Sequence, residues 1–455
     1  MSLSVSTSVL AAAPTPLVER RSGPAGSLIL VEPEPALPLV RVIVALRSGS
    51  AWDPRKKDGL ANLVGETARH GAAHRSRTDL DRQLDALGAV IDVQTDADSL
   101  RFEGHVLTKH LDAFLGILAD IVLRPDFAPA EIDRTRQEIL ASVDEDRNDD
   151  QQLCARYFAR NLYAEHPYGH APDGDRASLE RITAGDLSAF HKRHVVGSNL
   201  IFAAYGDVTP TDFATRVGRA FSSTPKGATP GANPLTTRDP VPPQGWRISI
   251  VDKPDREQVQ IMFGNIALPA QHADFVPLMV AISSFGGHGM TATLMDEVRT
   301  KRGLSYGAYM SLSQRFGRAA TVGWVSSAKN KAITTLKLVL RLYVALMEKG
   351  LSDRKVALAK TFLSGTLGAE MDEPEHRLDA RVTAEITGLP ATFVDDLPSR
   401  VRAVTTDQVN AAIKRHVHAR DLAITVVATA SEFRKRLLES KVAPSAIDVV
   451  PFDDY

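Results

Sequence analysis

Three side chains in the first quarter of the chain carry metal-binding groups at helical spacing. Glu66, His70 and His74 follow one another at intervals of four residues, which would stack a carboxylate and two imidazoles on one helical face. These are ligand types that zinc accepts. Gly71, however, is a residue that commonly ends a helix, and it would leave His74 in a loop. Two exposed histidines are the simpler interpretation, and we expect this chain to bind no metal.

A second pair of residues could bind a peptide. Arg299 is predicted near the end of a helix over residues 290–301, and Gly303 allows the left-handed turn that leaves it. Tyr306 follows at the start of the next predicted strand, so both side chains can converge beyond the end of the helix. A guanidinium and a phenol hydroxyl held together can donate hydrogen bonds to a peptide carbonyl or to a developing oxyanion. The alternative interpretation is that Arg299 is an ordinary exposed side chain and that Tyr306 is a structural residue of a hairpin, with no role in binding.

A glycine-rich segment resembles a nucleotide-binding turn. Residues 287–292 read Gly-His-Gly-Met-Thr-Ala and fit the pattern G-x-G-x-x-A before a predicted helix. A dinucleotide site also needs an acidic residue about 20 positions later, at the end of a strand. Residues 307–310 occupy that position and contain no acidic side chain. We therefore expect no nucleotide cofactor.

Composition limits the class of protein. The 455 residues are enough for two to four domains, and the 44% hydrophobic and 24% charged content is typical of globular chains. Lys and Arg number 54 against 55 Asp and Glu, so no basic excess exists to bind nucleic acid. The single cysteine, Cys154, excludes an internal disulfide and a thiolate zinc site. No apolar run reaches the roughly 18 residues of a membrane-spanning helix.

The chain divides near its middle at a proline-rich segment. Residues 223–245 contain six prolines and three glycines, a composition that predicts a linker without strand or helix. We therefore expect two domains, over residues 20–222 and 246–455.

The two halves share an internal repeat. Residues 183–203 align with residues 405–425 at an offset of 222, and Lys-Arg-His-Val is identical at 192–195 and 414–417. In both copies an amphipathic helical pattern leads into an apolar strand. We predict two copies of one α/β unit.

The elements expected in each half are strands, a hairpin and grouped helices. Strands are predicted over 27–32, 40–47, 247–251 and 258–263, hairpins over 90–106 and 306–326, and helices over 59–69, 78–87, 111–123, 128–144, 151–163 and 332–349. This mixture predicts an α+β fold in which each half is a largely antiparallel sheet with helices packed on one face.

Five segments spread along most of the chain carry a family resemblance. They are Gly59–Glu66, Gly88–Ser99, His166–Gly169, Gly206–Val208 and Arg299–Tyr306. Together these segments resemble the pitrilysin/insulinase family of zinc peptidases. In that family an Arg/Tyr pair belongs to the half without zinc and reaches the substrate at the metal of the other half. The resemblance gives Arg299 and Tyr306 this role.

The catalytic signature of this family is altered in the chain. The signature is His-x-x-Glu-His on a helix, in which two histidines bind zinc and the glutamate is the general base. The resemblance places Asn62, Gly65 and Glu66 at these positions, and Ala141 and Ser142 where a later helix supplies a third, glutamate ligand. Asn is a poor zinc ligand, Gly cannot polarise water, and Glu66 alone cannot hold the ion. The sequence predicts a chain released from catalysis.

We therefore expect a non-catalytic, substrate-binding subunit of a bacterial heterodimeric zinc endopeptidase that acts on peptides or unfolded segments. The resemblance implies a homologous catalytic partner that has an intact His-x-x-Glu-His motif and holds the zinc, whereas this chain binds no cofactor. One alternative is a catalytically silent scaffold subunit of a larger complex. Another is an autonomous peptidase with a metal site rebuilt from Glu66, His70 and His74. Leu10 to Ala13 resembles the end of a secretory leader and favours a periplasmic over a cytoplasmic location.

Overall fold

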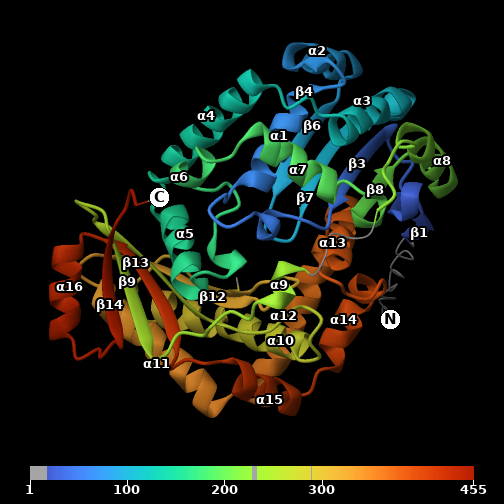
Figure 1. Ribbon diagram of the computed structural model, residues 1–455. Coiled ribbons are helices and arrows are strands. Elements are labelled where there is room, and N and C mark those ends of the chain that lie inside the picture. Colours follow the sequence, from blue (N-terminus) through green and yellow to red (C-terminus); the bar gives the residue numbers. More distant parts are fainter. Residues whose placement is uncertain (1–17, 228–232, 288, 455) are drawn as a thin grey trace, which may run out of the picture.

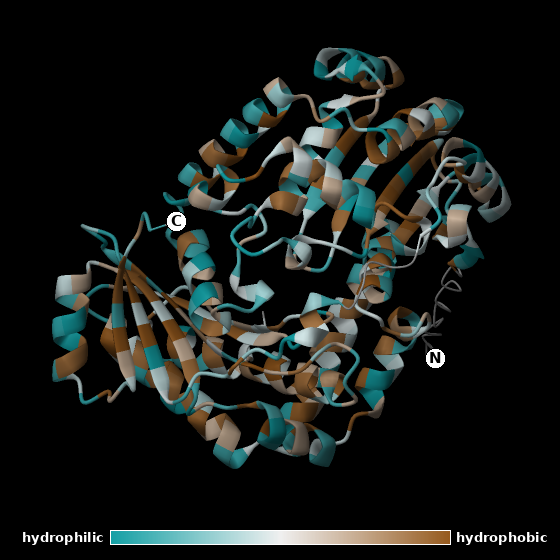
Figure 2. Ribbon diagram, in the orientation of Figure 1, coloured by the Kyte–Doolittle hydropathy of each residue, from teal (hydrophilic) through white to brown (hydrophobic). Residues whose placement is uncertain are grey.

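The computed structural model describes residues 18–227, 233–287 and 289–454, and its two halves each contain a six-stranded sheet (Figure 1). The leader-like residues 10–13 and His288 of the glycine-rich segment lie outside this described part. None of the helices in the described ranges is long and apolar enough to cross a membrane. Hydrophobic residues are concentrated along the strands and on the helix faces turned toward them (Figure 2).

The first sheet has the strand order β1-β2-β8-β3-β7-β6. Its strands are β1 (Glu19–Ser22), β2 (Leu28–Pro33), β3 (Leu39–Leu46), β6 (Val90–Thr95), β7 (Leu100–Leu107) and β8 (Leu200–Gly206). Only the β2–β8 pair is parallel, so the sheet is largely antiparallel as predicted. β6 pairs with β7 alone and forms one edge of the sheet.

Helices of the first half cover one face of this sheet. They are α1 (Leu60–Arg69), α2 (Arg77–Leu87), α3 (Leu111–Leu123), α4 (Pro129–Asp146), α6 (Arg176–Leu179), α7 (Ala184–His194) and α8 (Pro210–Ala220), with the small hairpin β4 (Gly71–Ala72) and β5 (Arg75–Ser76) between α1 and α2. Leu63, Phe114 and Phe202 are fully buried where α1 and α3 meet the sheet. Burial of one apolar stripe per helix against the sheet forms the first core.

The second half repeats this arrangement with the strand order β11-β12-β10-β13-β9-β14. Its strands are β9 (Trp246–Asp252), β10 (Gln258–Ile266), β11 (Ala308–Leu312), β12 (Ala320–Ala328), β13 (Leu422–Ala428) and β14 (Ala446–Pro451). Its helices are α10 (Phe275–Gly286), the π-helix η6 (Met295–Thr300), α11 (Ala332–Lys349), α12 (Asp353–Asp372), α14 (Phe393–Ala403), α15 (Thr406–His416) and α16 (Ala430–Glu439).

The predicted repeat is confirmed by the matching elements. Helices α7 and α15, and strands β8 and β13, have bounds that differ by the predicted offset of 222 residues. Both helices begin with a capping box in which a threonine, Thr183 or Thr405, caps the helix and a side chain three residues later bonds back to it. The same local signal therefore starts the same helix in each half.

Two repeat-related helices cross from one half to the other. α5 (Asp150–Tyr163) follows the first half in sequence but packs on the second sheet, and α13 (Pro374–Ile386) of the second half packs on the first sheet (Figure 1). Each sheet thus has its own helices on one face and a helix from the other half on the opposite face. Sequence patterns predicted a helix over 151–163, which is α5, but they predicted neither α13 nor the exchange.

The two crossing helices are held by different interactions. α5 buries Cys154, Tyr157 and Phe158 against β10 and β13, and the free thiol of Cys154 donates to the carbonyl of Thr425 at 3.4 Å. α13 buries Leu378, Val382 and Ile386 against the first sheet.

Charged pairs also tie α13 to the first sheet. The guanidinium of Arg377 donates to Glu32 of β2 at 2.6 Å, and both side chains are almost fully buried. Arg41 of β3 pairs with Asp379 at 3.1 Å and with Glu103 at 2.6 Å. Removal of one partner of a buried pair typically costs about 3–5 kcal/mol, because the other charge remains without compensation.

The proline-rich segment is not free of helix, contrary to our prediction. Pro234–Thr237 forms a single helical turn, α9, in which the Asn233 side chain accepts from the backbone N–H of Leu235. Proline is favoured at a first helical position because its missing N–H needs no partner there. Leu235 is 5% exposed and packs in the core between the halves, so this part of the segment is anchored.

The exchange of α5 and α13 predicts that the halves stay together when the chain is cut. A specific protease site placed between residues 226 and 233 should be cleaved to give two fragments that co-elute as one full-sized particle in size-exclusion chromatography. The fragments should separate under denaturing conditions, and Arg377→Ala should weaken their association. Elution of the native cut protein as two half-sized species would contradict the exchange.

Candidate functional site

The first residues of α1 are fixed by the half-buried carboxylate of Asp53. Both oxygens of Asp53 accept hydrogen bonds from the backbone N–H groups of Gly59, Leu60 and Ala61 at 2.9 to 3.2 Å. Gly59 has φ 93°, and a Cβ there would lie 2.8 Å from the carbonyl oxygen of Asp173. Glycine permits both the left-handed backbone and this close approach, so the helix that should carry the zinc motif starts at a defined place.

The residues at the zinc-motif positions of α1 do not fit a zinc ion. Gly65 is buried, and a Cβ at this position would lie 2.6 Å from Leu100 Cδ1 and 2.7 Å from Val93 Cγ1. The space that a general-base side chain would need is therefore filled by two aliphatic side chains from β6 and β7. Asn62 is half-buried, and its amide is a weak ligand for zinc.

The expected third-ligand positions on α4 supply no ligand either. Ala141 and Ser142 are both exposed on this helix, and neither has a carboxylate. With Asn62, Gly65 and Glu66 on α1, they complete a set of side chains that cannot coordinate zinc in the family's manner.

The alternative metal site from Glu66, His70 and His74 does not assemble. α1 ends at Arg69, and His74 has φ 62° with a fully exposed side chain. His70 Nδ1 lies 2.7 Å from Arg77 Nη2, and burial together with Arg77 lowers the pKa of His70 to about 4. Burial raises the pKa of Glu66 to about 7. Among the residues that the structure describes, these three side chains do not form a group that could hold a metal ion.

Arg77 is the charged centre beside the altered motif, and sequence reasoning missed it. Its guanidinium contacts Glu131 at 2.8 Å and Glu138 at 2.9 Å, and hydrogen bonds from Arg77 lower the pKa of Glu138 to about 2. Two of the glutamates of α4 are thus paired with one arginine. No spacing rule could reveal this contact, since Arg77 and Glu138 are 61 residues apart.

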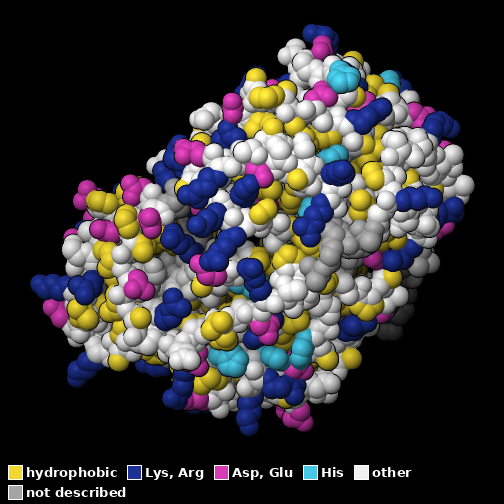
Figure 3. All heavy atoms as spheres, viewed as in Figure 1, with side chains coloured by type: hydrophobic (Ala, Val, Ile, Leu, Met, Phe, Trp, Pro, Cys, Tyr) yellow, Lys and Arg dark blue, Asp and Glu magenta, His cyan; other side chains and the backbone are white. Residues whose placement is uncertain are grey.

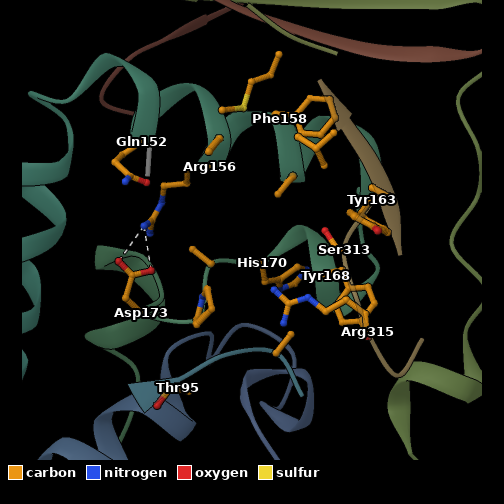
Figure 4. A pocket seen from close by; sticks show the side chains of 18 of the residues that line it. Thr95, Gln152, Arg156, Phe158, Tyr163, Tyr168, His170, Asp173, Ser313 and Arg315 are labelled. Carbon is orange, nitrogen blue, oxygen red and sulfur yellow. Dashed lines mark hydrogen bonds and ion pairs between the residues drawn. The ribbon is translucent and has the colours of Figure 1, made fainter. Parts of the chain in front are cut away.

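A cavity of about 660 Å³ lies between the two halves next to Asn62. Its wall combines α5, the tip of the β6–β7 hairpin, the tip of the β11–β12 hairpin and the segment around Tyr168 (Figure 4). The lining includes Asn62, Thr95, Ala97, Asp146, Gln152, Arg156, Phe158, Tyr163, Tyr168, His170, Asp173, Met262, Ser313, Arg315 and Val322. Its volume lies in the range of ligand-binding cavities. Asn62 is the predicted site residue that lines it.

Paired charges organise the wall of this cavity. Arg156 of α5 donates to both carboxylate oxygens of Asp173 at 2.9 and 3.0 Å (Figure 4). His170 Nδ1 lies 2.5 Å from Asp58, and the hydrogen bond with this carboxylate raises the pKa of His170. These pairs come from segments on either side of α1, so they hold the wall next to the altered motif.

The two hairpin tips are joined by a buried polar cluster. Tyr168 donates to Asp98 at 2.8 Å and accepts from the backbone N–H of Gly317 at 2.9 Å, which connects the first half to the second. Arg315 lies 3.5 Å from Asp98 and stacks over the Tyr168 ring. Burial raises the pKa of Asp98 to about 6, an effect that Arg315 opposes. Tyr168 belongs to the His166–Gly169 segment, which carries part of the family resemblance. No sequence pattern indicated its hydrogen-bond partners.

Arg299 and Tyr306 lie outside the cavity wall. Arg299 is exposed on η6, a π-helix in which the N–H of Lys301 donates to the carbonyl of Asp296, five residues earlier. Gly303 has φ 55°, which confirms the predicted left-handed exit, although β11 begins at Ala308, two residues after Tyr306.

Both side chains of this pair are available to another molecule. Tyr306 is 88% exposed, and within the described part of the chain neither Arg299 nor Tyr306 has a hydrogen-bonding side-chain partner. Their convergence on one ligand stays a prediction. Single-turn π-helices occur often at functional sites.

The filled space around Gly65 gives a stability prediction. Gly65→Ala should lower the free energy of unfolding by about 1–3 kcal/mol, because its methyl group would overlap Val93 and Leu100. Gly218→Ala on α8 is the matched control, since a Cβ at Gly218 meets no atom within 4 Å. That control should raise stability by about 0.5–1 kcal/mol through helix propensity. Urea unfolding measures both, and equal effects of the two substitutions would show that the space at Gly65 is open.

Comparison with known proteins places the chain in a family. Residues 28–172 match the family described as Insulinase (Peptidase family M16), and residues 181–363 match the Peptidase M16 inactive domain. A Helicobacter pylori protein named non-peptidase homolog YmxG is 22% identical over 402 residues, which cover 88% of this chain and 91% of the relative. An uncharacterized zinc protease of Mycobacterium tuberculosis is 23% identical over 409 residues, with 88% and 91% covered.

A further relative and a solved structure support the same family. The beta subunit of the mitochondrial-processing peptidase of Blastocladiella emersonii is 22% identical over 426 residues, covering 89% of this chain and 87% of that protein. The crystal structure of a peptidase M16 inactive domain from Pseudomonas fluorescens matches with a TM-score of 0.81 at 24% identity, covering 90% of this chain and 98% of that one. Since the family matches span most of the chain and the fold is shared along nearly its whole length, the chain belongs to the insulinase-type M16 peptidase family.

Proposed function

We propose that this chain is the non-catalytic, substrate-binding subunit of a heterodimeric zinc endopeptidase. Its partner would be a homologous chain with an intact His-x-x-Glu-His helix, which holds the zinc and performs the chemistry. The observation that carries this proposal is the state of α1: the motif positions lack ligands, and Val93 and Leu100 fill the space beside Gly65. The name of the Helicobacter pylori relative, non-peptidase homolog, supports a silent M16 chain.

Peptides or unfolded segments are the substrate class that the geometry favours. β6 pairs with β7 on one side only, so its other edge can accept an extended peptide through backbone hydrogen bonds. Thr95, the last residue of β6, lines the cavity between the halves. A peptide strand added along β6 would therefore run toward the cavity.

Arg299 and Tyr306 would act on substrate at the partner's zinc. Both side chains are exposed and have no hydrogen-bonding side-chain partner in the described part of the chain. An arginine and a phenol can stabilise the negative charge that develops on a peptide carbonyl during hydrolysis. The beta-subunit name of the mitochondrial relative supports an assembly of more than one chain.

A scaffold subunit without any role in cleavage is the second candidate. The buried polar cluster of Asp98, Tyr168 and Arg315 favours it, because this cluster joins the halves directly and needs no ligand. The two candidates differ in whether Arg299 and Tyr306 contribute to cleavage by the assembled complex.

Reconstitution with a catalytic partner tests the proposal. The purified chain with added Zn²⁺ should cleave no fluorogenic unstructured peptide, whereas a mixture with a homologous chain from the same organism that has the intact motif should cleave it. Replacement of the general-base glutamate of that partner by glutamine should abolish the activity. Full activity of the partner alone, or the absence of a complex, would exclude the proposed role.

Substitutions at the Arg/Tyr pair separate a substrate-binding subunit from a scaffold. Arg299→Ala and Tyr306→Phe should each lower kcat of the complex by about 10²–10³-fold if they stabilise the transition state, and Arg299→Ala should also raise KM. Arg420→Ala is the control, because Arg420 is an exposed arginine of the same half that pairs with Glu348. Unchanged kcat and KM in both variants, with the complex intact, would assign the chain to the scaffold role.

A further inference from the structure

Two helices of the second half meet at a carboxylate and two imidazoles. His272 lies in the loop before α10, Asp274 directly precedes α10, and His416 is the last residue of α15. Their potential ligand atoms all lie within 4.8 Å of one another, and no other set of three such side chains is found in the described ranges. Histidine side chains gather on this part of the surface, near α10 and α15 (Figure 3).

The distances suit a small coordination sphere. His416 Nε2 lies 2.8 Å from Asp274 Oδ2, and His272 Nδ1 lies 3.9 Å from the same oxygen. The two imidazole rings are 5.0 Å apart and nearly perpendicular. Around an ion with bonds of about 2.0–2.2 Å, neighbouring ligand atoms lie roughly 3–3.5 Å apart. An ion could therefore bind between His416 and Asp274 once these two ligand atoms move slightly apart and the His272 ring turns to point a nitrogen at it.

The groups around the three side chains decide which ion would bind. Arg415 donates to Asp274 Oδ1 at 2.8 Å, which holds the carboxylate and leaves Oδ2 for an ion. This arrangement resembles the hydrogen-bonded carboxylates that surround many metal sites. The positive charge of Arg415 also weakens the attraction for any cation. With one carboxylate available, the site lacks the several oxygen ligands of Ca²⁺ or Mg²⁺, and its imidazoles suit zinc-like ions.

One existing hydrogen bond must be exchanged. The backbone N–H of Asp274 donates to His272 Nδ1 at 3.0 Å, so ligation through this nitrogen requires the ring to turn away. The His272 side chain is 43% exposed, and this exposure leaves room for the rotation.

We propose that His272, Asp274 and His416 form a binding site for a divalent transition-metal ion such as Zn²⁺, with water in the remaining positions. The site joins the start of α10 to the end of α15, which are 142 residues apart in sequence. It lies in the second half, whereas the altered zinc motif lies on α1 of the first half, so it does not depend on the proposed peptidase role. No motif in the sequence indicates this site, because its residues are too far apart along the chain.

Metal titration of the whole chain tests this site. Untagged, metal-stripped protein should bind one Zn²⁺ per chain in calorimetry, and Co²⁺ should give visible absorption bands of a protein-bound ion. Zn²⁺ should also raise the melting temperature in a saturable way, since the ligands are assembled only in the folded chain. His272→Ala and His416→Ala should each weaken binding by about tenfold or more.

Matched variants keep the test decisive. His418→Ala changes a neighbouring histidine outside the set, and His70→Ala changes one beside α1; both should bind Zn²⁺ as the parent chain does. His416→Ala also removes a hydrogen bond with Asp274, so His272→Ala, which leaves that hydrogen bond intact, is the critical variant. Lack of saturable Zn²⁺ binding by the parent chain, or binding that His272→Ala leaves unchanged, would overturn the proposal.

Discussion

The reciprocal placement of α5 and α13 is the constraint on which the rest of the structure depends. A sheet with helices on one face leaves its other face bare, and each half of this chain covers that face with a helix from the other half. Neither half can bury both faces of its sheet alone. The buried pair of Arg377 and Glu32 adds specificity, because any other docking of α13 would leave both charges without a partner.

This exchange also creates the cavity. α5 can cover the second sheet only if the first half lies across the second, and that arrangement brings the β6–β7 and β11–β12 hairpin tips together. Tyr168, Asp98 and Gly317 then close the contact between the tips. The cavity beside Asn62 is thus a consequence of how two equivalent units cover each other, and its volume does not require an intact zinc motif.

The sequence predicted elements whose signals are local. The repeat at an offset of 222, the helix over 332–349 and the hairpin over 90–106 all appear in the structure, because capping residues, apolar periodicity and glycine stops act within a few residues. The helical turn at Pro234 was missed because its stability comes from the burial of Leu235 in a distant core. The partners of Arg77 and Asp98 were missed for the same reason: they include residues 61 and 70 positions away in the chain, which only the folded structure brings together.

The altered motif shows that the residues which position α1 differ from the residues which would bind zinc. Asp53 still holds the start of α1, and Gly59 still allows its close approach to the Asp173 loop, so the helix keeps its position without metal ligands. Val93 and Leu100 occupy the space beside Gly65, and Arg77 pairs with both Glu131 and Glu138 on α4. Two neighbouring carboxylates repel each other unless a cation lies beside them. An arginine beside these carboxylates lets the framework stay folded without metal ligands on α1.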